Sequence, residues 1–236
     1  MTALDRALPV ERRRILLAFL GTAVIDVVAE LTHLDVIANL AKPLLIPALI
    51  WWVLAVRGPT APRLLVGGLV LAWLGDIALM LPGDTAFIVG LLLFLGMQVC
   101  YSRGFVGLGG IAALRSARWL PVVGAALWVG LNVALGPSLG SLRLPLLVYS
   151  AALTTMAVLA CGVSLGVHSP RLGIGGVTFL VSDLLIGLDA AGIDVPLHGP
   201  LVMATYVVGQ LLIVTGWVAA QRLATTETAA VATAEA

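Results

Sequence analysis

Apolar runs long enough to cross a membrane follow one another along nearly the whole chain, and they restrict its fold more than any other feature. Of the 236 residues, 61% are hydrophobic and 11% are charged, and the mean hydropathy is +1.11. A soluble domain carries roughly 25% charged residues, because polar side chains must cover its surface. The composition therefore excludes a water-soluble globule and a disordered chain, and it predicts an integral membrane protein.

The number of membrane crossings follows from the length of the apolar runs. A helix crosses the roughly 30 Å hydrocarbon layer in about 20 residues. We therefore predict an all-α polytopic membrane protein, with one transmembrane domain (residues 1–222) of eight helices: 15–32, 36–56, 63–81, 86–106, 119–136, 142–165, 172–190 and 199–221. The small, polar and acidic tail, residues 223–236, is predicted to be disordered.

The basic residues predict the orientation of these helices. With eight crossings, eleven of the twelve arginines fall on the side that both termini share, and Arg143 alone falls on the other. Because cytoplasmic loops are enriched in Lys and Arg, both termini are predicted to be cytoplasmic in the inner or plasma membrane. The net charge of +1 excludes a nucleic-acid partner, since no basic stripe is available to neutralise phosphates.

Two segments of the chain resemble each other and predict an internal repeat. Residues 67–81 and 174–188 each place a small residue before an aspartate, as Gly75-Asp76 and Ser182-Asp183. The shift that superposes Asp183 on Asp76 also brings Tyr149 onto Lys42. Two parallel four-helix halves would explain this correspondence, and chance similarity among apolar runs is the alternative.

Five ionisable residues fall within predicted spans: Asp26, Glu30, Lys42, Asp76 and Asp183. Each costs roughly 2.5–3.5 kcal/mol at membrane depth, so such residues indicate a buried site. At 1.5 Å of rise per residue, Lys42, Asp76 and Asp183 all lie between the midplane and the outer face, where they can converge. Asp26 and Glu30, one helical turn apart, are expected to line a water-exposed rim. Lys42 is expected either to neutralise an aspartate or to bind a substrate phosphate.

Other polar residues in the spans are predicted to support this site through hydrogen bonds between helices. They are Gln98, Tyr101, Tyr149, Tyr206 and Gln210. The three histidines, His33, His168 and His198, lie at span ends or in loops, and no histidine lies near Ser150 or Ser182. We therefore predict no metal site, no cofactor and no serine nucleophile, which leaves a pair of carboxylates as the chemistry of the site.

Six short motifs resemble, in order, those of the YhhN-like lysoplasmalogenases. They are Lys42-Pro43-Leu44, Leu74-Gly75-Asp76 and the runs 94–101, 144–150, 179–188 and 206–213. The resemblance, from about residue 36 to 215, implies a polytopic hydrolase that cleaves the vinyl-ether bond of lysoplasmalogens to a fatty aldehyde and a glycerophospho-ethanolamine or -choline. It places the two characteristic acidic positions of the family on Asp76 and Asp183, which we predict to be the catalytic residues. Where the family often has histidine, this chain has Gln98, which exchanges no proton near neutrality.

The chemistry of a vinyl ether suits two carboxyl groups. Protonation of the β-carbon gives an oxocarbenium ion, which water captures as a hemiacetal that collapses to aldehyde and alcohol; one carboxyl acts as the acid and the other stabilises the cation. Which aspartate is the acid is left open. The expected partners are a lysophospholipid and bilayer lipids, and the oligomeric state is left open. The alternatives are a transporter built on parallel repeats, and a non-catalytic protein whose buried charges hold its helices together.

Overall fold

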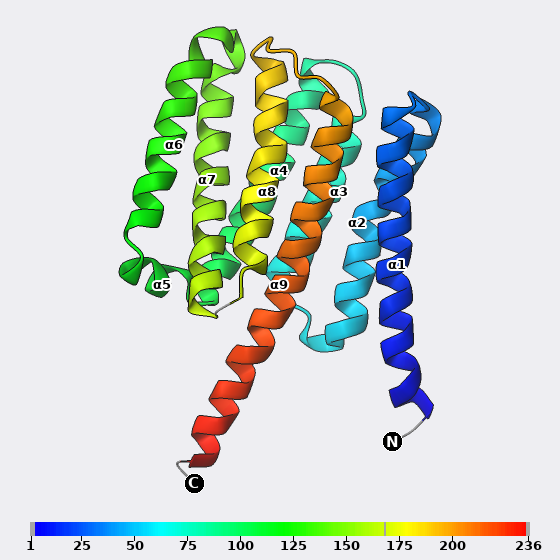
Figure 1. The fold of residues 1–236 in the computed structure, drawn as a ribbon, viewed down its shortest axis with the longest axis vertical. Coiled ribbons are helices and arrows are strands. Elements are labelled where there is room, and N and C mark those ends of the chain that lie inside the picture. Colours follow the sequence, from blue (N-terminus) through cyan, green and yellow to red (C-terminus); the bar gives the residue numbers. More distant parts are fainter. Residues whose placement is uncertain (1–2, 168, 235–236) are drawn as a thin grey trace.

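The computed structural model describes residues 3–167 and 169–234, and nearly all of them are in α-helices. The long helices are α1 (Ala3–Leu31), α2 (Asp35–Arg57), α3 (Arg63–Leu79), α4 (Asp84–Gly107), α6 (Trp119–Leu135), α7 (Arg143–Gly166), α8 (Arg171–Ala190) and α9 (His198–Ala234). The short helix α5 (Gly110–Ser116) connects α4 to α6, and short 3₁₀ turns occupy Gly58–Thr60, Gly136–Ser138 and Gly140–Leu142. The start of α1 and the end of α9 lie at the same end of the bundle (Figure 1).

Within the described residues, six helices are long and apolar enough to cross a membrane, which makes the chain an integral membrane protein of the all-α class. They are α2, α4, α6, α7, α8 and the first part of α9. Helix α3 has 17 residues, and α1 carries arginines before its apolar stretch and Asp26 and Glu30 within it. The eight predicted spans therefore coincide with eight long helices, whereas eight crossings and the repeat stay predictions.

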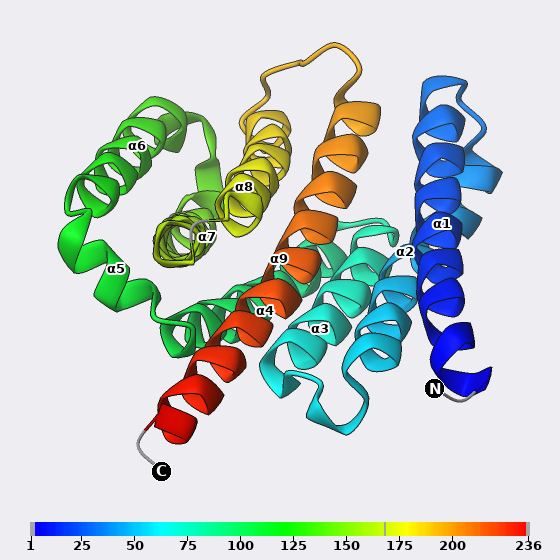
Figure 2. The ribbon, with the colours of Figure 1, turned by 60° about the horizontal axis from the view of Figure 1, so that its bottom comes forward.

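Helices that follow each other in the chain pack side by side, as α1 with α2, α3 with α4, α7 with α8 and α8 with α9. The two halves of the chain meet where α4 packs against α7 and where α1 and α2 pack against α9. Helix α6 packs against α7 on the outer side of the bundle, where Figure 2 shows α7 nearly end-on between α6 and α8.

Glycines bring α8 and α9 into close contact. A Cβ at Gly175 of α8 would lie 2.8 Å from the backbone nitrogen of Ile213, and one at Gly209 of α9 would lie 2.9 Å from the backbone nitrogen of Phe179. Real Cβ atoms do not approach a backbone this closely, so these positions accept only glycine without a shift of the helices. This packing of small residues is the usual way in which membrane helices approach one another, and it sets the position of Tyr206 on α9.

Proline disfavours helical backbone in the residue before it, yet α2 runs without a break through Pro43 and Pro47. Proline at position 47 removes the N–H that would bond the carbonyl of Pro43 four residues earlier. The indole Nε1 of Trp73 on α3 donates to that carbonyl instead, at 2.9 Å. A side chain from the neighbouring helix thus satisfies the backbone group that the proline leaves open, and the helix continues.

The last helix also departs from the sequence prediction. Helix α9 continues to Ala234, so residues 223–234 are helical where a disordered tail was predicted. This segment contains many alanines and neither glycine nor proline. Alanine has the highest helix propensity of all residues, so nothing in the local sequence ends the helix. Residues 235–236 of the predicted tail lie outside the described part of the chain.

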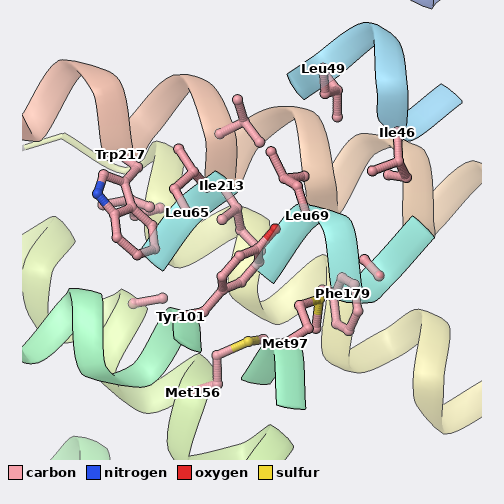
Figure 3. Packing of buried hydrophobic residues seen from close by; sticks show 14 of the residues in the cluster. Ile46, Leu49, Leu65, Leu69, Met97, Tyr101, Met156, Phe179, Ile213 and Trp217 are labelled. Carbon is pink, nitrogen blue, oxygen red and sulfur yellow. The ribbon is translucent and has the colours of Figure 1, made fainter. Parts of the chain in front are cut away.

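The largest buried side chains gather between α1, α2, α3, α4, α7, α8 and α9. In Figure 3, Tyr101 lies among Leu65, Leu69, Met97 and Ile213 at the centre of this cluster. Trp217 packs against the rings of Tyr101 and Phe105, with centroids 5.8 and 5.0 Å apart. This core joins the two halves of the chain and holds in place the helices that carry the acidic residues.

Candidate active site

A cavity of about 390 Å³ lies among the long helices, and five of the eight predicted site residues line it. They are Lys42, Asp76, Tyr149, Asp183 and Tyr206. Most of the remaining wall is apolar, with leucines from α3, α4, α6, α7 and α8. The five residues come from α2, α3, α7, α8 and α9, so the fold brings together side chains that are far apart in the sequence.

Asp76 is held by a tyrosine from the other half of the chain. The Tyr206 hydroxyl on α9 donates to Asp76 Oδ2 on α3 at 2.7 Å. The ring of Tyr206 is itself held by Phe94 of α4 and Phe179 of α8, with centroids 6.1 and 5.7 Å away. Since Oδ2 is engaged, Oδ1 is the atom of this carboxyl that remains for a molecule in the cavity.

Asp183 has a matching arrangement with a different tyrosine. The Tyr149 hydroxyl on α7 donates to Asp183 Oδ2 on α8 at 2.5 Å. Each of the two predicted catalytic carboxyls is therefore fixed by one phenol, and both face a single cavity.

The other three predicted residues lie in the core instead of in the cavity wall. Gln98, Tyr101 and Gln210 are fully buried, with 0% of each exposed. The Tyr101 hydroxyl donates to Gln210 Oε1 at 3.0 Å, and Gln210 Nε2 donates to the sulfur of Met97 at 3.5 Å. Neither polar atom of the Gln98 side chain has a hydrogen-bond partner among the described residues. These three side chains form a buried layer next to Tyr149 and Tyr206, which hold the two aspartates. Gln210, for example, lies one turn beyond Tyr206 on α9.

Lys42 pairs with a residue that the sequence did not predict. Its Nζ atom lies 2.7 Å from Glu30 Oε1 on α1, in an ion pair that is mostly buried. Lys42 was expected to neutralise an aspartate or to bind a phosphate. The observed partner follows from the packing of α1 against α2, which places Glu30 next to it. The expectation that Glu30 and Asp26 line a water-exposed rim is wrong for Asp26, which is fully buried and whose oxygens accept no hydrogen bond from the described residues.

The Lys42–Glu30 pair predicts a coupled effect on stability. Lys42→Met and Glu30→Gln should each lower the thermal stability of the purified protein, because each leaves a mostly buried charge without its partner. The destabilisation of the double variant should be smaller than the sum of the two single effects by about 1 kcal/mol, because the effects of residues in direct contact are generally not additive. Asp35→Asn, at an exposed position of α2, is the matched control and should be neutral. Strict additivity of the two single effects would contradict the pairing.

Sequence reasoning missed a polar group of three side chains in the part of the cavity wall that α6 and α7 form. Trp128 and Asn132 of α6 and Ser150 of α7 all line it. Trp128 Nε1 and Asn132 Nδ2 lie 3.1 and 3.2 Å from the Ser150 hydroxyl oxygen. Asparagine within an apolar run was the available signal, since such a residue is costly in a membrane helix without partners.

Metal ligands do not gather anywhere in the described part of the chain: no three His, Cys, Asp or Glu residues are arranged to hold an ion. Of the predicted loop histidines, His198 lies with Nε2 3.1 Å from the carbonyl oxygen of Leu185, and His168 lies outside the described residues. The ionisable groups among the described residues that line the cavity are two carboxyls, two phenols and one ammonium group.

The chain is similar over most of its length to one known protein family. No curated protein and no solved structure matches the chain significantly. The model of the YhhN family matches residues 37–217, a segment that contains all eight predicted site residues and begins after Glu30. Because this match covers well over half of the 236 residues, the chain belongs to the YhhN family.

Proposed function

We propose that this protein is a membrane hydrolase that cleaves the vinyl-ether bond of lysoplasmalogen-type lysophospholipids. One observation carries the proposal: two carboxyl groups, each held by its own tyrosine, face one mostly apolar cavity within a helical membrane protein. Membership of the YhhN family and the resemblance of the motifs around Asp76 and Asp183 to lysoplasmalogenases support the same conclusion.

The reaction needs one water and no group beyond those of the cavity. One aspartic acid protonates the β-carbon of the vinyl ether, and the π electrons of the double bond form the new C–H bond. The other aspartate stabilises the resulting oxocarbenium ion and takes a proton from the water that adds to it. In the hemiacetal, the first aspartate, now ionised, takes the hydroxyl proton while the C–O bond to glycerol breaks, and the second aspartic acid protonates the leaving glycerol oxygen. The products are an aldehyde and an alcohol, and both carboxyl groups return to their starting forms. An apolar cavity suits the long alkenyl chain and excludes other water from the cation.

The assay that tests this function is aldehyde release in detergent from a vinyl-ether lysophospholipid. We expect one fatty aldehyde and one glycerophospho-alcohol per substrate. A saturated alkyl-ether analogue should give neither product, because it has no double bond to protonate. Absence of aldehyde from the vinyl ether would contradict the proposal, and so would passage of intact lysolipid or a small solute across proteoliposomes without chemical change, the result for a transporter.

We further propose that all eight long helices cross the membrane and that both termini are cytoplasmic. The distribution of arginines supports this orientation, and an even number of crossings agrees with the position of the start of α1 and the end of α9 at one end of the bundle (Figure 1).

Single-cysteine labelling tests this topology. In a background without Cys100 and Cys161, cysteines placed at Asp84, Asp194 and Ser116 are all at exposed positions. We expect an impermeant thiol reagent to label positions 84 and 194 on intact cells or spheroplasts, and position 116 only after permeabilisation. The inverse pattern would reverse the orientation, and labelling of all three from one side would contradict the eight crossings.

A further inference from the structure

The polar group on α6 and α7 presents an unused hydrogen-bond acceptor at the cavity wall. Asn132 Nδ2 donates to the backbone carbonyl of Trp128 at 2.8 Å and lies 3.2 Å from the Ser150 hydroxyl oxygen. Trp128 Nε1 also donates to that hydroxyl, and the hydroxyl donates to the carbonyl of Leu147 at 3.2 Å. Ser150 therefore has its full set of partners, and both N–H groups of Asn132 are used.

These contacts determine which way the Asn132 amide points. A backbone carbonyl only accepts hydrogen bonds, so the amide nitrogen, and not the oxygen, must face Trp128. The oxygen Oδ1 then lies on the other side of the amide, and it accepts no hydrogen bond from the described residues. Asn132 is half-buried and lines the cavity, so this oxygen is within reach of a molecule bound there.

A neutral acceptor in an apolar wall selects a particular kind of ligand group. Leaving such an oxygen without a donor is costly, whereas one good hydrogen bond offsets the cost. Phosphate, ether and ester oxygens do not donate, so they leave Oδ1 unsatisfied. A hydroxyl or an N–H of an ammonium group satisfies it. Lysophospholipids carry both kinds of donor: the free hydroxyl on the middle carbon of glycerol, and the ammonium of an ethanolamine head group.

We propose that Asn132 Oδ1 is a specificity determinant that accepts a hydrogen bond from a donor group of the lysophospholipid, held in place by Trp128 and Ser150. This inference rests on the proposed function for the identity of the ligand. It adds a neutral recognition site on α6 and α7 to the acidic groups of α3 and α8.

Binding of non-cleavable ligands tests the proposal independently of turnover. The probes are saturated 1-O-alkyl lysophospholipids, with an ethanolamine or a choline head group, and with the middle glycerol carbon bearing a hydroxyl or only hydrogen. Their affinities are measured by ligand-dependent thermal shift and by titration in nanodiscs for the wild type, Asn132→Leu, Ser150→Ala and Thr155→Val. Thr155 is the matched control, because its hydroxyl bonds Ala151 on the exposed side of α7 and it does not line the cavity.

The outcomes distinguish the glycerol hydroxyl from the ethanolamine ammonium as the donor to Asn132. If the hydroxyl is the partner, its removal should weaken binding to the wild type roughly three- to tenfold, the range that one neutral hydrogen bond supplies, and Asn132→Leu should bind both forms equally. If the ammonium is the partner, the wild type should bind the ethanolamine probe more tightly than the choline probe, and Asn132→Leu should abolish this preference. Equal ratios in the wild type and Asn132→Leu for both pairs of probes would overturn the proposal.

The remaining variants guard against misfolding and against failure of the catalytic proposal. Ser150→Ala removes the anchor of the amide without changing Asn132, so it should reduce the same preference partly, and it serves where Asn132→Leu does not fold. An unchanged preference in a folded Ser150→Ala variant would contradict the role of Ser150 as an anchor. Lack of aldehyde release would refute the proposed function alone, since the binding contrast does not depend on cleavage.

Discussion

Replacing Asp76 or Asp183 by asparagine is expected to remove nearly all vinyl-ether cleavage while the protein still inserts and folds. Asparagine keeps the size of the side chain and can still accept a hydrogen bond from Tyr206 or Tyr149. It supplies neither a proton nor a negative charge. General acid–base catalysis contributes roughly 10²–10⁴-fold to a rate, so the kcat of each variant should fall by at least about 10²-fold.

The controls separate catalysis from the general effect of losing a carboxylate. Asp189→Asn changes an exposed residue at the C-terminal end of α8, the helix that carries Asp183. Asp84→Asn changes an exposed residue at the start of α4, and neither residue lines the cavity. Both should keep the wild-type rate. The measurements are aldehyde release at saturating substrate and elution as a single species in detergent. An Asp76→Asn or Asp183→Asn enzyme with more than about a tenth of the wild-type rate would exclude that residue as acid or base.

Replacing Gly104 by alanine is expected to destabilise the fold more than any other single added methyl group. A Cβ at Gly104 on α4 would overlap the six-membered ring of Trp217 on α9. That ring has nowhere to move, because Trp217 is 1% exposed and its ring packs against those of Tyr101 and Phe105. Overpacking of this kind costs roughly 1–3 kcal/mol. A shift of α9 away from α4 would also displace Tyr206 from Asp76, so activity should fall with stability.

Gly107→Ala on the same helix is the matched control, because an added Cβ there meets nothing within 4 Å. It should be neutral or slightly stabilising, since alanine is favoured over glycine in a helix by roughly 0.5–1 kcal/mol. The measurement is the midpoint of thermal unfolding in detergent for both variants. Equal midpoints for Gly104→Ala and Gly107→Ala would contradict the close contact between Gly104 of α4 and the Trp217 ring of α9.

The positions of the long helices follow mostly from the local sequence. Hydrophobic length and punctuation by proline and glycine located most ends of the long helices to within a few residues, because a helix in a membrane is determined by its own run of apolar residues. The two exceptions are α1, which begins at Ala3 and not at residue 15, and α9, which continues to Ala234. The cost of charge at membrane depth singled out Asp76 and Asp183, and both line the cavity.

The partners of these residues were decided by the tertiary structure. Tyr206 was predicted near the site, but its bond to Asp76 and that of Tyr149 to Asp183 depend on which faces of α3, α7, α8 and α9 meet. The same holds for Lys42, which pairs with Glu30 because α1 packs beside α2.

The physical reason is that an apolar helix in a membrane has no strong preference for its own rotation about its axis. Lipid and protein interior are similarly apolar, so the hydrophobic pattern that orients a helix in a soluble protein is weak here. Rotation and neighbours are set by close contacts between distant residues, such as Gly209 against Phe179 and Gly104 against Trp217. The sequence by itself determined which residues lie at membrane depth, and only the packing of the helices decided which of them share the cavity.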